Sequence, residues 1–185
     1  MMRPMENRQR GFTLVELLVA LTIVGILAAV AAPSFVSVVN SNRLAVQANE
    51  LLSAIQYART EAIRSSATVT FCGAASAAAD SDDDCSDGAQ PYWVVIGRTD
   101  DGGQEQLRVF ALNEAVTVST SLERISFSAD GLARDPDDAN ALLVGEVTVC
   151  VETRNPAQNK RVLNIASGSR LAISTPAEDG EGSCE

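Results

Sequence analysis

Four cysteines and one carboxylate inside an apolar segment are the residues of this 185-residue chain whose types and positions could do chemistry. The cysteines are Cys72, Cys85, Cys150 and Cys184, and none forms a CxxC pair, so the sequence indicates neither a zinc ribbon nor a thioredoxin-like site. Because the chain contains no histidine, it lacks the commonest general base and the commonest metal ligand. An even number of cysteines beyond a membrane segment is typical of disulfides in an oxidising compartment.

Enzyme, metal and cofactor sites are not predicted. The chain shows no nucleophile elbow, P-loop or Rossmann fingerprint. The acidic stretch DSDDDCSDG, residues 80–88, lacks the regular alternation and the closing glutamate of an EF-hand, so we interpret it as a solvated loop and not as a calcium site. The formal net charge of -10 also disfavours non-specific binding to nucleic acid or anionic lipid.

The carboxylate is Glu16, at the start of a segment that is otherwise apolar. Residues 17–40 carry no charge, and roughly 20 apolar residues suffice to span a bilayer as a helix. The preceding flank is basic, with Arg3, Arg8 and Arg10 against Glu6. By the positive-inside rule, this flank stays in the cytoplasm and the rest of the chain is exported.

A secretory signal peptide and a plain membrane anchor are the alternatives for this segment. AAVAAPS, residues 28–34, has the small residues of a signal-peptidase site. A signal core is shorter, roughly 7–15 residues, and would not hold a carboxylate at the position of Glu16. The length of the apolar run therefore favours a retained span.

Beyond the span, apolar residues recur at spacings of four and three as far as about Arg64, which predicts an amphipathic helix continuous with the membrane segment. These residues are Leu44, Ala48, Leu51, Ile55, Ala58 and Ala62. The face that they form needs a sheet to cover it.

Short β-rich segments supply that sheet. They are residues 67–71, 92–97, 105–112, 115–119, 124–128, 146–152, 161–166 and 169–174. The last two read as a hairpin around Gly168, and residues 74–90 read as an exposed, irregular loop. We therefore predict an α+β protein: a long N-terminal helix, half transmembrane and half amphipathic, packed on an antiparallel β domain.

The segment GFTLVELLVALTIVGILAAVAAPSF, residues 11–35, resembles the type III signal of type IV pilins and type II secretion pseudopilins. Downstream, LLSAIQYARTEAIRSSATVTFCG, ISFSADGLA, VTVCVET and KRVLNIASGSRLAIS are similar to the GspH/FimT branch, which includes the FimU-like minor pilins. The resemblance implies that a prepilin peptidase cuts between Gly11 and Phe12 and methylates Phe12. The expected divisions are a leader (1–11), an assembly helix (12–40), an amphipathic half (41–66) and a periplasmic β domain (67–185).

The resemblance also assigns roles within the span. Glu16 would meet the terminal ammonium of Phe12 on a neighbouring subunit, so that its charge is satisfied only after processing and docking. Helix would be lost between Gly25 and Pro33 when the chain packs in a filament. Alternatively, these two are ordinary membrane-helix residues, since glycine and proline are frequent there.

Four cysteines allow three disulfide connectivities. Cys72 and Cys85 flank the acidic loop, so a bond between them closes a short loop. The resemblance to FimU-like pilins implies that Cys184, next to last in the chain, joins Cys150 and ties the tail to the sheet. Of the three connectivities, this pairing is preferred.

The resemblance implies a minor pilin that initiates or caps a type IV pilus, with roles in pilus assembly, twitching motility and adhesion. Its partners would be other pilins, the prepilin peptidase and the inner-membrane assembly machinery. It would cross the bacterial inner membrane once, with its C-terminal domain in the periplasm, before joining the filament. The alternative is a GspH-type minor pseudopilin of a type II secretion system; the C-terminal cysteine favours the pilus.

A third possibility is a DNA-binding pilin for natural transformation. Some FimT-like pilins carry a Gly-Arg-x-Arg segment near the C-terminus, and here Gly168 is followed by Ser169 and Arg170, with no second arginine. The basic residues near this hairpin are Lys160, Arg161 and Arg170, and they are few against an acidic chain. We therefore expect no DNA binding.

Overall fold

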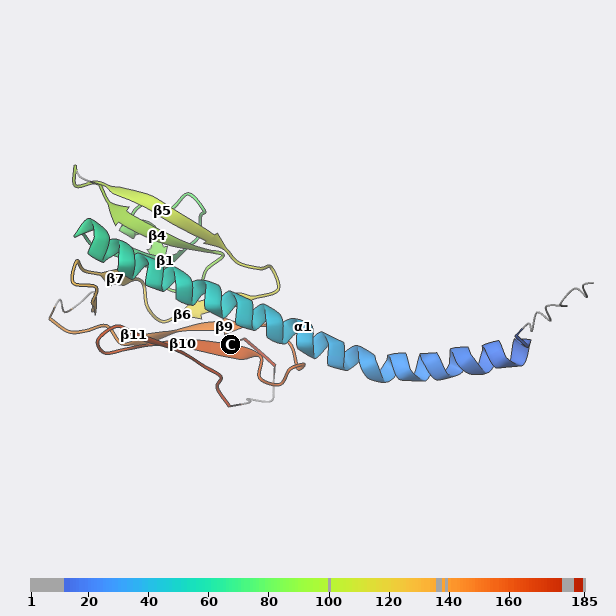
Figure 1. Cartoon of the computed structure of the whole chain (residues 1–185). Helices are drawn as coiled ribbons and strands as arrows, with labels where there is room; N and C mark the ends of the chain where they lie inside the picture. Colours follow the sequence, from blue (N-terminus) through green and yellow to red (C-terminus); the bar gives the residue numbers. More distant parts are fainter. Residues whose placement is uncertain (1–11, 100, 136–137, 139, 178–181, 185) are drawn as a thin grey trace, which may run out of the picture.

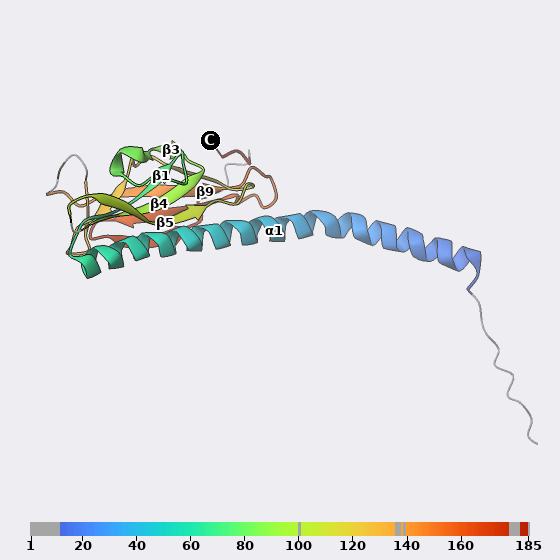
Figure 2. The same cartoon turned by 90° about the horizontal axis from the view of Figure 1, so that it is seen from above.

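The computed structural model describes residues 12–99, 101–135, 138, 140–177 and 182–184. One helix, α1 (Leu14–Ser65), dominates it, and its C-terminal half lies along the β domain while its N-terminal half projects away (Figures 1 and 2). The helix ends at Ser65, and the C-cap Ser66, with a left-handed φ of 53° and an N–H bond to the Ala62 carbonyl, closes the last turn. The predicted end near Arg64 is thus confirmed.

The β domain consists of two antiparallel sheets, where the sequence predicted a sheet domain without this division. The first sheet contains β1 (Val69–Ala74), β2 (Cys85–Ser86), β4 (Tyr92–Arg98), β5 (Gln104–Ala111), β7 (Ile125–Phe127) and β8 (Ala133–Arg134). Its order is β5-β4-β1-β7-β8, with β2 pairing β1. The second contains β3 (Gly88–Ala89), β6 (Thr117–Thr120), β9 (Gly145–Cys150), β10 (Lys160–Ala166) and β11 (Arg170–Ser174), in the order β11-β10-β9-β6-β3.

All eight predicted strands are present, as β1, β4, β5, β6, β7, β9, β10 and β11. The predicted hairpin is β10–β11, with Ala166 opposite Arg170. Its turn holds Gly168 and Ser169 at φ 79° and 58°, a backbone region that favours glycine. The two-residue strands β2, β3 and β8 were not predicted, because pairing with a neighbour, and not local sequence, defines them.

The main core lies between α1 and the inner faces of both sheets. All six residues of the predicted apolar face of α1 are at most 1 % exposed. Across from them, Trp93 stacks on Phe71 with ring centroids 5.2 Å apart. Full burial of a large apolar side chain contributes roughly 1.5–3 kcal/mol to the free energy of unfolding, so this face fixes the helix on the sheets.

A smaller core on the outer face of the first sheet corrects the prediction for residues 74–90. This segment holds a short helix, η1 (Asp82–Asp84), as well as β2 and β3, and its Ala79 is buried. Ala79 packs with outward-facing residues of β1 and β4: Cys72, Ala74, Val94 and Ile96. Because β1 is central and buried on both faces, its outer face needs a cover, which the loop provides.

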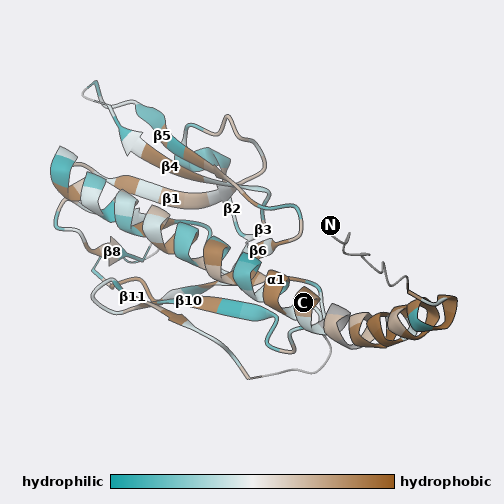
Figure 3. Cartoon of the chain, turned by 45° about the vertical axis from the view of Figure 1, so that its right-hand side comes forward, coloured by the Kyte–Doolittle hydropathy of each residue, from teal (hydrophilic) through white to brown (hydrophobic). Residues whose placement is uncertain are grey.

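Hydropathy divides α1 into two parts. The projecting half is apolar apart from a hydrophilic stretch near its outer end, whereas the half beside the sheets alternates between apolar and polar residues (Figure 3). In this single chain the helix runs unbroken past residues 25 to 33. The loss of helix between Gly25 and Pro33 concerns the assembled filament and remains a prediction.

Candidate functional site

The projecting half of α1 is the first part of the candidate site. Large apolar side chains remain exposed along it from Phe12, which is 88 % exposed, to Val38. It belongs to a helix that is long and apolar enough to cross a membrane. At 1.5 Å per residue, residues 14–40 extend about 40 Å, which exceeds a hydrocarbon core of about 30 Å. This half therefore needs a membrane or other subunits to cover it.

Glu16 lies in the first turn of α1, where Thr13 satisfies its carboxylate. The Thr13 N–H and hydroxyl both donate to Glu16 Oε2, each at 3.0 Å. In return, the Glu16 N–H donates to Thr13 Oγ1 at 3.2 Å. This is a capping box, which satisfies backbone donors that a helix start otherwise leaves free. A carboxylate here also interacts favourably with the positive end of the helix dipole.

Thr13 is the residue that the sequence analysis missed. A threonine followed three residues later by glutamate, directly before an apolar run, is a recognisable capping-box signal. The capping box shows how a single chain holds the Glu16 carboxylate before any neighbouring subunit is present. Phe12 lies exposed just before the cap, whereas Gly11, on the other side of the predicted cleavage point, lies outside the described residues.

A polar belt holds α1 where it enters the β domain. The Asn40 amide, 6 % exposed, donates to the Asn155 carbonyl at 2.9 Å and to Thr153 Oγ1 at 3.4 Å. About two helical turns further along α1, Gln47 Oε1 accepts a hydrogen bond from the backbone N–H of Asn113 at 3.2 Å. These bonds join the helix to loops from both sheets, and so they set the direction in which the apolar half leaves the domain.

The C-terminal tail is locked beside this belt. A disulfide joins Cys150 to Cys184, with Cα atoms 5.6 Å apart. The buried amide of Asn159 donates to the Ser183 carbonyl at 3.2 Å and to the Val151 carbonyl at 3.0 Å. The Thr153 N–H donates to the Gly182 carbonyl at 3.0 Å, so the residue that holds Asn40 is itself held by the tail.

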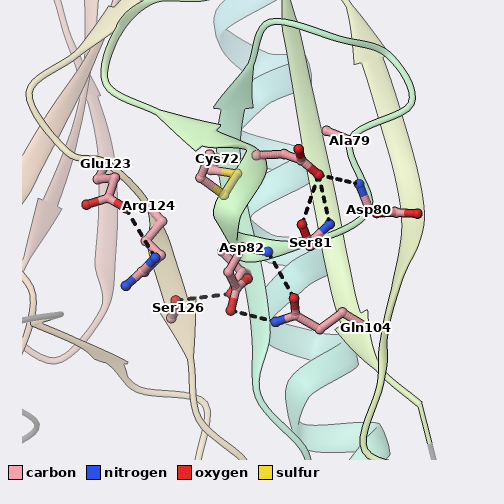
Figure 4. Close-up of a disulfide and its surroundings, with 12 residues drawn as sticks. Cys72, Ala79, Asp80, Ser81, Asp82, Gln104, Glu123, Arg124 and Ser126 are labelled. Atoms are coloured by element: carbon pink, nitrogen blue, oxygen red, sulfur yellow. Dashed lines mark hydrogen bonds and ion pairs between the residues drawn. A yellow bond between two sulfur atoms is a disulfide. The ribbon is translucent and has the colours of Figure 1, made fainter.

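The other disulfide, Cys72–Cys85, closes the acidic loop over the first sheet (Figure 4). The structure therefore has the preferred pairing of the four cysteines. The loop is tied down further where Asp82 Oδ2 accepts from the Gln104 amide at 2.7 Å (Figure 4).

Asp84 has a structural role in the same loop. The Ser81 hydroxyl and the backbone N–H groups of Asp80 and Ser81 donate to its carboxylate, and they hold the pKa of Asp84 below its ordinary value. Among the described residues, no group of three carboxylate or cysteine side chains is placed to hold a metal ion.

The basic residues proposed for DNA contact do not gather in one place. Lys160 begins β10, whereas Arg170 begins β11 opposite Ala166, six residues along β10 from Lys160. At about 3.3 Å per residue, they lie roughly 20 Å apart along the strands. Arg161 donates through Nη1 to the carbonyls of Gln158 and Lys160.

Ser169 stands where the first arginine of the Gly-Arg-x-Arg segment would be. It is 1 % exposed; its hydroxyl accepts from the Ala133 N–H at 2.6 Å and its carbonyl from Arg59 Nη1 at 3.1 Å. This position fixes the hairpin to α1 and β8, and an arginine there would lose the hydroxyl bond to Ala133 and place a long cationic side chain at a buried position.

We expect no measurable DNA binding by the processed chain at moderate salt, because the basic residues are dispersed over an acidic protein. A gel-shift titration in detergent checks this, with the variant Arg170→Ala beside the unmodified chain. Micromolar binding that weakens with added salt and disappears in Arg170→Ala would contradict the expectation.

Models of known protein families match both parts of this architecture. The family model described as type II transport protein GspH matches residues 47–169, and the model of the prokaryotic N-terminal methylation motif matches residues 7–32. No curated protein sequence matches the chain.

The solved structures that share the fold include those of two bacterial proteins. The type IV minor pilin FimU of Pseudomonas aeruginosa is 19 % identical with a TM-score of 0.52, over 73 % of this chain and 98 % of that one. The minor pseudopilin EpsH of the Vibrio cholerae type 2 secretion system is 11 % identical with a TM-score of 0.52, over 74 % of this chain and 99 % of that one.

A long helix whose apolar half carries an N-methylation motif, packed on two antiparallel sheets, is the fold of minor pilins and pseudopilins. The GspH model matches more than half of the sequence, and the chain belongs to the GspH family. The motif and the apolar helix fit a subunit that is anchored in the inner membrane and joins a filament.

Proposed function

We propose that this chain is a minor pilin that is incorporated into a type IV pilus and initiates or caps it. The observation that carries the proposal is the projecting half of α1, which is apolar on every side and has the capped Glu16 at its start. A single span surrounded by lipid needs no carboxylate. A carboxylate in the first turn of the helix suits a helix that later meets a positive charge on a neighbouring subunit.

The C-terminal lock supports the pilus over the secretion filament. A filament outside the cell is exposed to shear and to proteases, and a disulfide typically adds 2–4 kcal/mol to the free energy of unfolding. Cys150–Cys184 holds the end of the chain against the loop that positions α1. The second candidate is a minor pseudopilin of a type II secretion system, which the description of the matching family model favours.

We further propose that the peptidase cuts between Gly11 and Phe12 and methylates Phe12. The exposed position of Phe12 just outside the first helical turn supports access to the cut. The basic leader stays in the cytoplasm by the positive-inside rule, which places the β domain in the periplasm. Cleavage removes the leader and leaves the Phe12 ammonium next to the cap formed by Thr13 and Glu16.

Sheared surface filaments are expected to contain this chain beginning at methylated Phe12, eleven residues shorter than the full sequence. Intact-mass spectrometry of the filament fraction checks this.

Deletion of the gene for this chain should reduce the number of surface pili and leave type II secretion of enzymes unchanged, and restoring the gene is the control. Normal piliation with a loss of enzyme secretion would instead assign the chain to the secretion filament. A mature start near Ser34 would contradict the pilin proposal as a whole.

A further inference from the structure

At the point where α1 leaves the β domain (Figure 1), the helix and two loops line a cavity of about 330 Å³. We call it the proximal cavity. One loop joins β5 to β6, and the other follows β9. Asn40 and Arg43 of the helix, Glu114 of the first loop, and Glu152 and Thr153 of the second are among its lining residues. Ligand pockets in proteins range from about 300 to 1,000 Å³, so the cavity can take a small polar group.

Three charged side chains of the proximal cavity have no ion-pair partner among the residues that the structure describes. They are one cation, Arg43, and two carboxylates, Glu114 and Glu152, and all three are exposed. Arg43 Nη1 donates to Asn40 Oδ1 at 3.4 Å, and a guanidinium has five N–H donors, so most of its donors remain available. The cavity therefore offers charges of both signs to one occupant.

The position of Arg43 along α1 places the proximal cavity at a membrane surface. Arg43 is the next charged residue after Glu16 in the sequence. The two positions are 27 residues apart on one helix, which is about 40 Å at 1.5 Å per residue. A bilayer with its headgroup layers is about 40–45 Å thick. When Glu16 lies at one surface of the membrane, Arg43 and the cavity lie in the headgroup layer of the other.

Apolar surface continues from the proximal cavity toward the membrane. Val36 and Val38, on the membrane side of Asn40, are 47 % and 58 % exposed. A second cavity, of about 320 Å³, shares Arg43 with the first, and Val39 and Val46 are among its lining residues. An occupant that fits both the charges and this apolar surface has a charged head and apolar chains, as a phospholipid does.

We infer that the proximal cavity binds the headgroup of a phospholipid of the phosphatidylethanolamine class. The lipid phosphate accepts hydrogen bonds from the Arg43 guanidinium, and the primary ammonium donates to the carboxylates of Glu114 and Glu152. The lipid chains lie along the apolar side of α1 below the cavity. This site goes beyond the proposed function, because it holds the β domain against the membrane before the subunit enters a filament.

Other phospholipid headgroups fit these charges less well. An anionic headgroup without an amine would meet Arg43 but would be repelled by both carboxylates. A trimethylated ammonium, as in phosphatidylcholine, has no N–H group to donate to Glu114 or Glu152. The charges of the cavity therefore select a headgroup that has both a phosphate and a primary ammonium.

Native mass spectrometry of the full chain in detergent measures the bound lipid. Phosphatidylethanolamine, phosphatidylglycerol and phosphatidylcholine with the same acyl chains are added in equal amounts. The fraction of chains with one phosphatidylethanolamine should exceed the fraction with either other lipid by at least about fivefold, because only this lipid makes charge-assisted hydrogen bonds at both ends of its headgroup. Equal binding of the three lipids would overturn the inference, and so would displacement of the lipid by millimolar inorganic phosphate.

Charge variants separate the proximal cavity from general contact between lipid and the apolar helix. Arg43→Gln should lower the binding of phosphatidylethanolamine by at least about fivefold, because the phosphate loses its cation. The double variant Glu114→Gln with Glu152→Gln keeps the cation and removes the repulsion, so its preference should shift toward phosphatidylglycerol.

The matched control is Arg98→Gln, an exposed arginine beside the last turn of α1 at the other end of the domain. It should leave the lipid preference unchanged, and the fluorescence of Trp93 shows that each variant is folded. An unchanged preference in the double variant, or undiminished binding by Arg43→Gln, would overturn the inference.

Discussion

Replacing Glu16 with glutamine is expected to remove the chain from filaments while leaving it inserted, processed and folded. Glutamine can keep the capping box with Thr13, because its amide oxygen accepts the same bonds. It has no negative charge to meet the Phe12 ammonium of a neighbour. A buried charge left without its partner costs about 3–5 kcal/mol, so incorporation should fall by at least about a hundredfold.

Two further variants separate the charge of Glu16 from its capping role. Thr13→Ala keeps the charge and removes the cap, which costs about 1 kcal/mol, so incorporation should fall only severalfold. Glu16→Ala removes both and should behave like Glu16→Gln. The measurement is the ratio of the chain in sheared filaments to the chain in the inner membrane. Wild-type incorporation of Glu16→Gln would show that Glu16 serves the helix start alone.

Loss of the C-terminal disulfide should produce the largest change in stability. The double variant Cys150→Ser with Cys184→Ser opens a loop of 34 residues, and loop-closure entropy predicts a loss of about 3–4 kcal/mol in the free energy of unfolding. Opening the 13-residue loop with Cys72→Ser and Cys85→Ser should cost about 3 kcal/mol. The removal of both cysteines of a pair avoids a free thiol that could form wrong bonds.

Fluorescence of the single tryptophan provides the measurement. Trp93 lies in the main core and is 1 % exposed, so its fluorescence emission changes when the domain unfolds. The full chain is kept in detergent and unfolded with guanidinium chloride. Non-reducing peptide mapping of the unmodified chain should find Cys72 with Cys85 and Cys150 with Cys184. A Cys72–Cys150 link, or an unchanged unfolding midpoint in the Cys150/Cys184 variant, would contradict the assignment.

Much of the architecture could be predicted because the relevant signals are local. The spacing from Leu44 to Ala62 predicts the buried face of α1, and alternation or apolar runs predict each of the longer strands. The separation into two sheets could not be predicted, since it depends on which strands pair across long stretches of sequence. The cover that residues 74–90 provide was missed because Ala79, the buried side chain that packs it on the sheet, carries no distinctive signal.

The candidate site, like the fold, has parts that could be predicted from the sequence and parts that could not. Glu16 and the cysteines stand out by residue type, and the Thr13 cap could have been found from the spacing of Thr13 and Glu16. The polar belt could not be predicted, because Asn40 bonds to Thr153 and Asn155, which lie more than one hundred residues away in the chain. Nor does the sequence show that Ser169, at the position of the first arginine, is buried.

The position of Cys184 has a consequence for how a cut in the C-terminal segment affects the subunit. Cys184 follows β11, the last strand that the structure describes, and the bond that it forms holds the loop that contacts Asn40. A chain cut between β11 and Cys184 keeps its helix, its sheets and its first disulfide, but it cannot close this bond. The fold therefore distinguishes chains that keep the segment with Cys184 from chains cut before it, at the point where the helix leaves the domain.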